Sequence, residues 1–376
     1  MFQKLLQKHL ARGILGRKMQ SIDKGSIALA SDLGLKRTEN QDRTAVMKFR
    51  TSTAFYTVIA VVDGMGGMRD GEKSAELAIS TFFSTVLDNV HLGSEHAIMK
   101  ATQTANNAVF EFTKGKGGST LSAILLCSDD INMTVNVGDS RIYARNSALK
   151  VIRLTVDDSL AEAVGGSGTE LLQFIGMGEG IRPHVAPLIP EVKQVYLTTD
   201  GVHYIEPQTL SDIIKHAETI TQVIERLIAT ARWCGGPDNA TICAIDLELF
   251  NFEEHADDTA VVQISDPLGS MLFIGCNSNV EQQITPEKLT HNKAQDAGAS
   301  PNQSEKPVTD EINTSTSVDE QVQKPIEEAM TEATKPPKRK KHQPKKNVDK
   351  QSTEGEIQIM MTIFDDVSGE KDDSSK

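Results

Sequence analysis

Four aspartates share one sequence context, because each lies at an end of an apolar run and beside a small residue. The segment AVVDGMGG contains Asp63, VNVGDSR contains Asp139, VYLTTDG contains Asp200, and GGPDNATICAI places Asp238 just before such a run. Apolar runs of this length are typical of strands, and strand ends are rigid mounts for side chains. We therefore expect these acids to meet at one edge of a sheet.

Carboxylates gathered at one edge repel each other and need a positive counter-charge. A divalent cation supplies it, and ligation by oxygen alone suits Mg²⁺ or Mn²⁺ better than Zn²⁺. For any single Asp–Gly pair an ordinary turn is the simpler interpretation, and the glycines after Asp63 could instead cradle a phosphate. The segment RTENQD adds Arg37 and Asp42. Four acids in similar contexts favour a metal centre.

The elements that must position these acids can be predicted from periodicity. Helical spacing of apolar residues predicts a helix over 72–90, a second that begins after a Ser94 cap, and one or two more over 208–233. Runs rich in β-branched residues predict strands at 56–63, 121–128, 133–139, 194–200 and 240–247. Strands cluster and helices pair, without steady β-α-β alternation, which predicts a layered α+β architecture.

Composition divides the 376 residues into four expected regions. Residues 1–20 are basic and amphipathic, typical of a short appended helix, although a targeting peptide or a membrane-surface helix has the same character. Residues 21–276 hold the predicted folded domain. Residues 277–354 are predicted to form a disordered polar linker, whose basic patch is either a solvated charge run or a nuclear-localisation or polyanion contact. Residues 355–376 carry a short apolar island in an acidic tail, which we expect to dock a partner or the domain.

Charge and cysteine content exclude several classes of protein. A net charge of −13 argues against a specific nucleic-acid binder. No run approaches the ~20 apolar residues of a membrane span. The four cysteines lie far apart, without metal-finger spacing, which predicts reduced thiols instead of a disulfide framework. We therefore expect a cytoplasmic protein without a transmembrane segment.

Seven segments together resemble the metal-dependent type 2C family of protein serine/threonine phosphatases, in its compact bacterial form. Each segment alone is a weak signal, but all seven occur in the family's order and cover about residues 22–248. The resemblance implies an α-β-β-α sandwich of two mainly antiparallel sheets flanked by paired helices, with the catalytic domain at 21–276. The segments are RTENQD (37–42), VVDGMGG (61–67), GGSTLSAILL (117–126), NVGDSRIYA (136–144), LTVDDSL (154–160), LTTDGVHYI (197–205) and GGPDNATICAI (235–245).

The resemblance also implies the ligands of a binuclear metal centre. Asp63 is similar to the carboxylate that bridges two metal ions, and Gly64 to the residue whose carbonyl binds one of them. Asp200 and Asp238 resemble the other carboxylate ligands. Two ions of Mg²⁺ or Mn²⁺ are therefore the implied cofactors.

Three further roles follow from the same resemblance. Asp42 resembles an acid that holds a metal-bound water, and Arg37 the arginine that clamps the substrate phosphate. Asp139 resembles the acid that, with Asp200, forms a third and weaker metal site in many members.

The implied reaction is the hydrolysis of phosphoserine or phosphothreonine by one-step attack of a hydroxide that bridges two metal ions. Phosphorylated proteins are the implied substrates, and a serine/threonine kinase is the implied functional partner. Residues 157–183 correspond to the family's flap, which is short and glycine-rich here. One alternative is a non-catalytic module, a pseudophosphatase that binds phosphoproteins or a kinase. Another is a metal-dependent hydrolase of a different phosphoester.

Several positions depart from the family pattern or carry no assigned role. Position 65 is Met, where some members carry a histidine thought to protonate the leaving group, so the general acid is unassigned. Gln41 stands where other members often have an acid, and Met68 where bacterial members often have histidine. His203 is interpreted as an ordinary strand or loop histidine, although it follows the Asp200–Gly201 turn and could approach the site, and His184 is assigned no role.

The segment HADDTAVVQI (255–264) also resembles the last metal motif, so Asp257 or Asp258 could replace Asp238. Asp238 is preferred because Gly-Gly-Pro precedes it, as in the family pattern. The second copy is then predicted to be a terminal strand that pairs with 269–276.

Overall fold

A computed structural model describes four stretches of the chain. The predicted linker and tail, together with Met68, Asp257 and Asp258, lie outside the described residues. All described residues belong to one unit, Met1–Leu289. Among them, no helix combines the length and apolar character needed to cross a membrane. The described stretches are 1–65, 70–165, 170–252 and 261–274.

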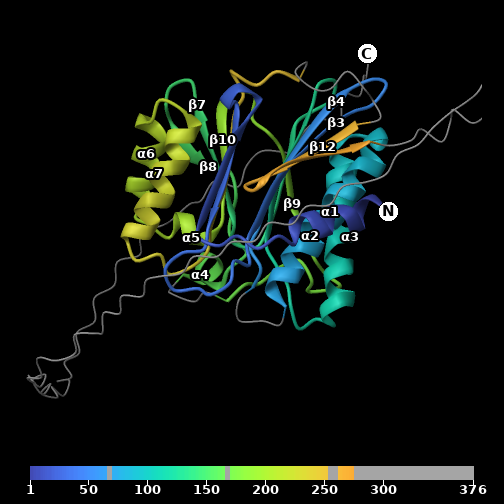
Figure 1. Ribbon diagram of the computed structural model, residues 1–376, viewed down its shortest axis with the longest axis horizontal. Helices are drawn as coiled ribbons and strands as arrows, with labels where there is room; N and C mark the ends of the chain where they lie inside the picture. The colour runs from blue at the N-terminus through green and yellow to red at the C-terminus, as the bar shows by residue number, and fades with distance from the viewer. Residues whose placement is uncertain (66–69, 166–169, 253–260, 275–376) are drawn as a thin grey trace, which may run out of the picture. The chain divides into compact units, whose positions relative to one another are not determined.

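The strands form two sheets in which every pair of neighbours is antiparallel (Figure 1). The first sheet has the order β1-β2-β11-β10-β7-β8, and the second has the order β13-β12-β3-β4-β5-β6-β9. The first consists of β1 (Arg17–Ile22), β2 (Ile27–Asp32), β7 (Arg141–Asn146), β8 (Val151–Arg153), β10 (Val192–Thr198) and β11 (Ala240–Asp246). The second consists of β3 (Arg43–Arg50), β4 (Phe55–Val62), β5 (Leu121–Cys127), β6 (Met133–Val137), β9 (His184–Pro187), β12 (Val261–Asp266) and β13 (Gly269–Ile274).

Helices cover the outer face of each sheet, as Figure 1 shows. The first sheet is covered by α5 (Asp200–His203), α6 (Pro207–His216) and α7 (Ile220–Trp233), and the second by α1 (Phe2–Leu10), α2 (Gly71–Asn89) and α3 (Ser94–Thr113). The remaining short helices are α4 (Leu160–Val164), η1 (Asp23–Gly25) and η2 (Val90–Leu92).

Alternation along the strands explains the four layers. In β4, Val58 and Val62 face the helices of the second sheet, whereas Ile59 and Val61 pack between the two sheets. Successive side chains of a strand point to opposite faces, so a strand buried on both faces becomes a continuous apolar run. The predicted α-β-β-α sandwich of antiparallel sheets is confirmed.

The five predicted strands are present. The region 208–233 forms two helices, α6 and α7. At the start of α7, the Thr219 side chain accepts a hydrogen bond from the backbone N–H of Gln222. The predicted Ser94 cap is wrong. Ser94 is the first residue of α3 and makes no side-chain cap, and its backbone N–H donates instead to Asp130 Oδ2 at 2.7 Å. Asp130 places a negative charge at the positive end of the helix dipole from another part of the chain.

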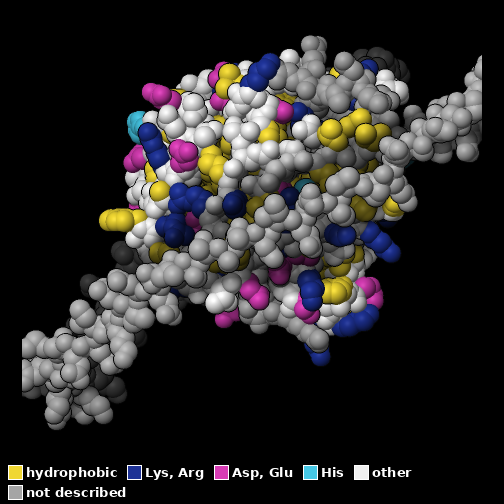
Figure 2. Space-filling view, viewed as in Figure 1, with side chains coloured by type: hydrophobic (Ala, Val, Ile, Leu, Met, Phe, Trp, Pro, Cys, Tyr) yellow, Lys and Arg dark blue, Asp and Glu magenta, His cyan; other side chains and the backbone are white. Residues whose placement is uncertain are grey.

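The segment 261–274 forms the β12–β13 hairpin, in which Val262 lies opposite Phe49 of β3. The prediction that the second Asp-Asp copy leads into a terminal strand paired with 269–276 is therefore confirmed. In the part of one face drawn in colour in Figure 2, acidic and basic side chains are interspersed. That face does not show the continuous basic surface typical of nucleic-acid binders.

Candidate active site

Six of the seven predicted site residues line a single pocket of about 490 Å³. Asp63 follows β4 and Asp139 follows β6, so both come from the second sheet. Asp200 begins α5 directly after β10, and Asp238 precedes β11, so both come from the first sheet. The pocket therefore lies where strand ends of the two sheets meet. The six residues are Arg37, Asp63, Gly64, Asp139, Asp200 and Asp238.

Two close backbone approaches bring the strand ends together. A Cβ atom on Gly64 would lie 2.3 Å from the carbonyl oxygen of Gly71, and one on Gly201 would lie 1.8 Å from that of Asn239. Both distances are too short for any side chain, so only glycine fits. The Gly64 contact packs the Asp63 turn against the start of α2, and the Gly201 contact packs the Asp200 turn against the Asp238 turn.

Thr120 holds the Asp63 turn from the neighbouring strand. Its backbone N–H donates to the carbonyl oxygen of Asp63 at 2.8 Å, and its Oγ1 accepts from the N–H of Asp63 at 3.0 Å. Thr120 Oγ1 also shares a 2.6 Å hydrogen bond with Ser140 Oγ, beside Asp139. The turns that carry Asp63 and Asp139 are therefore linked by two hydroxyl groups.

Asp42 does not line the pocket but lies buried beside it, with 1% of its surface exposed. Its Oδ2 accepts a hydrogen bond from Thr199 Oγ1 at 2.9 Å, and Thr199 immediately precedes Asp200. Its Oδ1 has no partner among the described residues. Thr199 was missed by sequence reasoning, although it lies in the quoted segment LTTDGVHYI.

Burial and mutual repulsion raise the pKa values of the clustered acids. Burial raises the pKa of Asp63 well above its usual value, and the charges of Asp42 and Asp200 add to the effect. Burial, with Asp200 next, raises the pKa of Asp139 to about 7. Burial likewise raises the pKa of Asp42 to about 7, against the hydrogen bonds that it accepts. The pKa of Asp200 is raised by burial and then by Asp238. The cluster therefore lacks positive charge.

Arg37 lies at the pocket with 41% of its side chain exposed, and its NH2 group donates to Asp238 Oδ2 at 2.5 Å. This hydrogen bond raises the pKa of the guanidinium. Within the described stretches, no three His, Cys, Asp or Glu side chains form a preformed set of metal ligands. Asp238 Oδ2 is already paired with Arg37.

Two observations nevertheless show that the residues present suit a divalent cation. Asp42 Oδ1 and Asp200 Oδ1 are buried carboxylate oxygens without a hydrogen-bond partner. A buried, unpaired carboxylate oxygen is costly unless a cation or a donor satisfies it. The donors are all oxygens, which is the set that Mg²⁺ and Mn²⁺ prefer.

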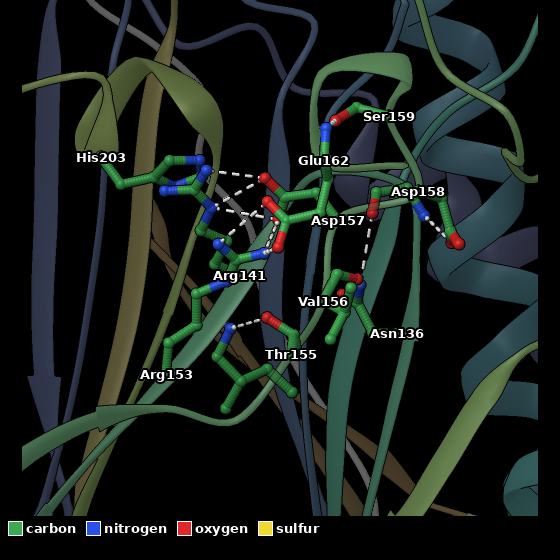
Figure 3. Close-up of polar contacts among 12 residues, drawn as sticks. Asn136, Arg141, Arg153, Thr155, Val156, Asp157, Asp158, Ser159, Glu162 and His203 are labelled. Atoms are coloured by element: carbon green, nitrogen blue, oxygen red, sulfur yellow. Dashed lines mark hydrogen bonds and ion pairs between the residues drawn. The ribbon is translucent and has the colours of Figure 1, made fainter. Parts of the chain in front are cut away.

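An ion-pair cluster joins β7, β8 and the segment that follows them (Figure 3). Asp157 accepts from Arg141 NH2 at 2.6 Å and from Arg153 NH2 at 2.9 Å. His203 is buried nearby, and burial together with these two arginines lowers its pKa well below the usual value. Its Nδ1 shares a hydrogen bond with Thr198 Oγ1 at 2.8 Å. His203 is therefore a neutral, buried histidine outside the pocket.

Asp158 holds the turn before Asp139 to the segment predicted to be the flap. Its carboxylate accepts from the backbone N–H of Gly138 at 2.9 Å and from Gln173 Nε2 at 2.9 Å, and it also contacts His184 Nε2 at 2.8 Å. Asp158 lies in the segment LTVDDSL, one of the seven that resemble the family, but the sequence alone assigns it no role.

A second cavity, of about 500 Å³, lies at the start of α3 and is lined in part by Leu92, Met99 and Ile131. It contains none of the predicted site residues. The carboxylate pocket is therefore the candidate active site.

Comparison with known proteins agrees with this site. A family model described as "Protein phosphatase 2C" matches residues 36–235, more than half of the chain. Protein phosphatase PhpP of Streptococcus pneumoniae is 26% identical over 245 residues, which cover 59% of this chain and 97% of that protein. Serine/threonine phosphatase stp of Listeria monocytogenes is 26% identical over 246 residues, which cover 58% of this chain and 94% of that protein.

Among solved structures, the serine/threonine phosphatase Stp1 from Staphylococcus aureus superimposes with a TM-score of 0.52 at 20% sequence identity, covering 62% of this chain and 99% of that chain. This likeness shows a shared fold. Together with the family match, it confirms the resemblance that the seven segments indicate. The chain belongs to the protein phosphatase 2C family of serine/threonine protein phosphatases.

Proposed function

We propose that this protein phosphatase hydrolyses phosphoserine and phosphothreonine in proteins with the help of two Mg²⁺ or Mn²⁺ ions. The observation that carries the proposal is the convergence of partly buried carboxylates, which lack a positive counter-charge, from both sheets on the pocket that holds Arg37. Asp63, the Gly64 carbonyl, Asp200 and Asp238 would hold the two ions. Asp139 with Asp200 would hold a third, weaker one.

When bound, the ions would lower the pKa of a bridging water, so that hydroxide can attack the phosphorus at neutral pH. Asp42, buried and fixed by Thr199, would accept a hydrogen bond from water at its free Oδ1. Arg37 would hold phosphate oxygens through a planar, permanently charged fork.

The described lining residues supply no free hydroxyl or thiol nucleophile for a covalent intermediate. Among the described lining residues Thr120 carries the single hydroxyl group, and its Oγ1 is engaged by the Asp63 N–H and by Ser140. Met65 cannot donate a proton. This arrangement supports direct attack by water, because phosphoryl transfer needs mainly positioning and charge stabilisation.

The test is phosphate release from a phosphothreonine peptide by the purified full chain with Mn²⁺, beside Asp63→Asn and Asp200→Asn variants. We expect metal-dependent turnover that falls about 100-fold or more in both variants, because each loses a ligand carboxylate. Asp212→Asn on α6 is the matched control and should keep wild-type turnover.

A folded wild-type protein that binds the peptide without turnover in excess Mn²⁺ would contradict the proposal and favour the phosphoprotein-binding alternative. Repeating the assay with a protein phosphorylated by a serine/threonine kinase tests the implied substrate class. A kinase of that kind is the functional partner that this activity implies.

A further inference from the structure

Arg43, the first residue of β3, uses its entire guanidinium group inside the protein. Only 3% of its side chain is exposed. Nε donates to the Leu10 carbonyl at 2.7 Å, and NH1 donates to the carbonyls of Asn40 and Asp42 at 2.7 and 2.8 Å. Arginine has five N–H donors in a rigid plane, so this side chain fixes several segments at defined angles.

NH2 of Arg43 reaches the first two turns of α2. It donates to Glu72 Oε1 at 2.6 Å and to Glu76 Oε1 at 3.0 Å. Burial raises the pKa of Glu76, and the nearby Arg43 opposes that rise. The guanidinium therefore joins three segments: the last turn of α1, the loop before β3, and the start of α2.

One of these segments, the loop before β3, carries the predicted metal-site residue Asp42. Asp42 directly precedes Arg43 in the chain, and its backbone N–H donates to Asn40 Oδ1 at 3.0 Å. The backbone N–H of Gly64 donates to the Gln41 carbonyl at 3.2 Å. Holding the carbonyls of residues 40 and 42 thus fixes both the Asp42 backbone and the Gln41 carbonyl that accepts from Gly64.

The third segment, α1, lies outside residues 36–235 that match the family. It packs on α2 (Figure 1) through Leu6 and Leu10, which are fully or almost fully buried. Gln3 Nε2 donates to Thr81 Oγ1 at 2.6 Å. The carbonyl of Leu10 belongs to the last turn of α1, where carbonyls have no partner within the helix and attract cations. Arg43 supplies that partner.

We propose that Arg43 is a positioning residue through which docking of α1 sets the geometry of Asp42 and thereby the affinity of the site for divalent cations. This inference rests on the proposed metal-dependent function. When α1 separates from the domain, the buried Nε–H of Arg43 loses its acceptor, the Leu10 carbonyl. The guanidinium then shifts, and the loop that carries Asp42 shifts with it. The N-terminal helix then acts as a built-in regulator of metal loading.

A merely structural α1 would lower stability without a selective effect on metal binding. The chain offers a matched pair of helices to separate the two roles. Leu6 and Leu10 are buried four residues apart on α1, and Leu210 and Ile214 are buried four residues apart on α6, which packs on the other sheet. Replacing either pair by alanine removes similar apolar packing.

The experiment measures the Kd for Mn²⁺ by isothermal titration calorimetry on the full chain, with Tm and phosphopeptide turnover recorded alongside. We expect Leu6→Ala with Leu10→Ala to raise the Kd about tenfold, within the range found when groups that support metal ligands are lost. The Leu210→Ala with Ile214→Ala control should leave the Kd within about twofold at a similar loss of Tm. Saturating Mn²⁺ should restore kcat in the α1 variant.

Arg43→Lys keeps the charge but cannot reach all five acceptors. We expect Arg43→Lys to raise the Kd for Mn²⁺ about as much as the Leu6→Ala and Leu10→Ala pair does. Adding that pair to Arg43→Lys should raise the Kd no further, because both changes break the same connection between α1 and the Asp42 loop. Two results would overturn the inference. One is an equal change in the Kd for Mn²⁺ in the α1 and α6 variants. The other is that the fold-changes in Kd caused by Arg43→Lys and by the α1 pair multiply when the substitutions are combined. If Arg43→Lys does not fold, the comparison of the two helices decides.

The outcomes also separate this inference from the proposed function. Wild-type protein that binds no Mn²⁺, or an Asp63→Asn variant with wild-type Kd, would overturn both. Wild-type binding that depends on Asp63 but not on α1 would overturn the coupling alone.

Discussion

Asp63 shows the conflict between stability and function at the scale of one residue. Its carboxylate is partly buried near four other acids, and its pKa is raised well above the usual value by burial and by those charges. An acid whose pKa is higher in the folded state than in the unfolded state destabilises the fold once it ionises. A bound cation would offset this cost, so the destabilising residue is the one that the site needs.

We therefore predict that Asp63→Asn makes the metal-free protein more stable at pH 8 while it abolishes turnover. A neutral amide removes a buried charge, and we expect Tm in EDTA to rise by about 2–4 °C, as for a gain of about 1 kcal/mol in a domain of this size. Differential scanning fluorimetry measures the change. An unchanged or lower Tm in EDTA would show that the carboxylate is not under electrostatic strain.

At the scale of elements, the segment after β8 stabilises one side of the pocket through ion pairs and a hydrogen bond. Asp157 links β7 to β8 through Arg141 and Arg153, and Asp158 reaches the Gly138 N–H just before Asp139. These contacts explain how a short segment can hold the Asp139 turn without an additional strand.

We predict that Asp158→Ala lowers the free energy of unfolding by about 2 kcal/mol, because it leaves the buried N–H of Gly138 without a charged acceptor. Urea unfolding of the metal-free protein measures the loss. His184→Ala is the control, since His184 contacts the same carboxylate but half of its side chain is exposed. We expect its effect to stay below about 1 kcal/mol. Equal losses of unfolding free energy in both variants would contradict the stabilising role of the Asp158–Gly138 hydrogen bond.

For the whole molecule, the clustered acids make stability depend on pH and on metal together. Asp42 and Asp139 have folded-state pKa values raised to about 7, whereas an unfolded aspartate titrates near 3.9. Because these pKa values are raised, their contribution to stability is fully present below about pH 4 and is lost as the pH rises through about 7.

We predict that Tm in EDTA falls between about pH 4 and pH 7, and that the increase in Tm on adding Mn²⁺ grows over the same range. A cation that binds only the folded state stabilises it, and it binds ionised carboxylates best. Asp42→Asn with Asp139→Asn should flatten the fall in EDTA. An equally steep fall in that double variant would assign the pH dependence to other groups.

Much of the fold could be predicted because its signals are local. The run FYTVIAVV is apolar on both faces, and β4 is buried on both faces, so the pattern and the structure share one cause. The helix over 72–90 was likewise predicted within one residue at each end, since α2 spans Gly71–Asn89. The Ser94 cap failed because its acceptor, Asp130, is 36 residues away in the chain.

The sequence by itself determined five of the strands, the paired helices, the family, and which acids stand at strand ends, because periodicity and motif order are properties of neighbouring residues. Only the tertiary structure decided that Asp42 is buried against Thr199, 157 residues away, and that Arg43 ties α1 to the Asp42 loop and α2. Such contacts depend on how layers pack, and no local spacing encodes them. The physical reason is that a buried charge is tolerated only where the whole fold brings partners to it.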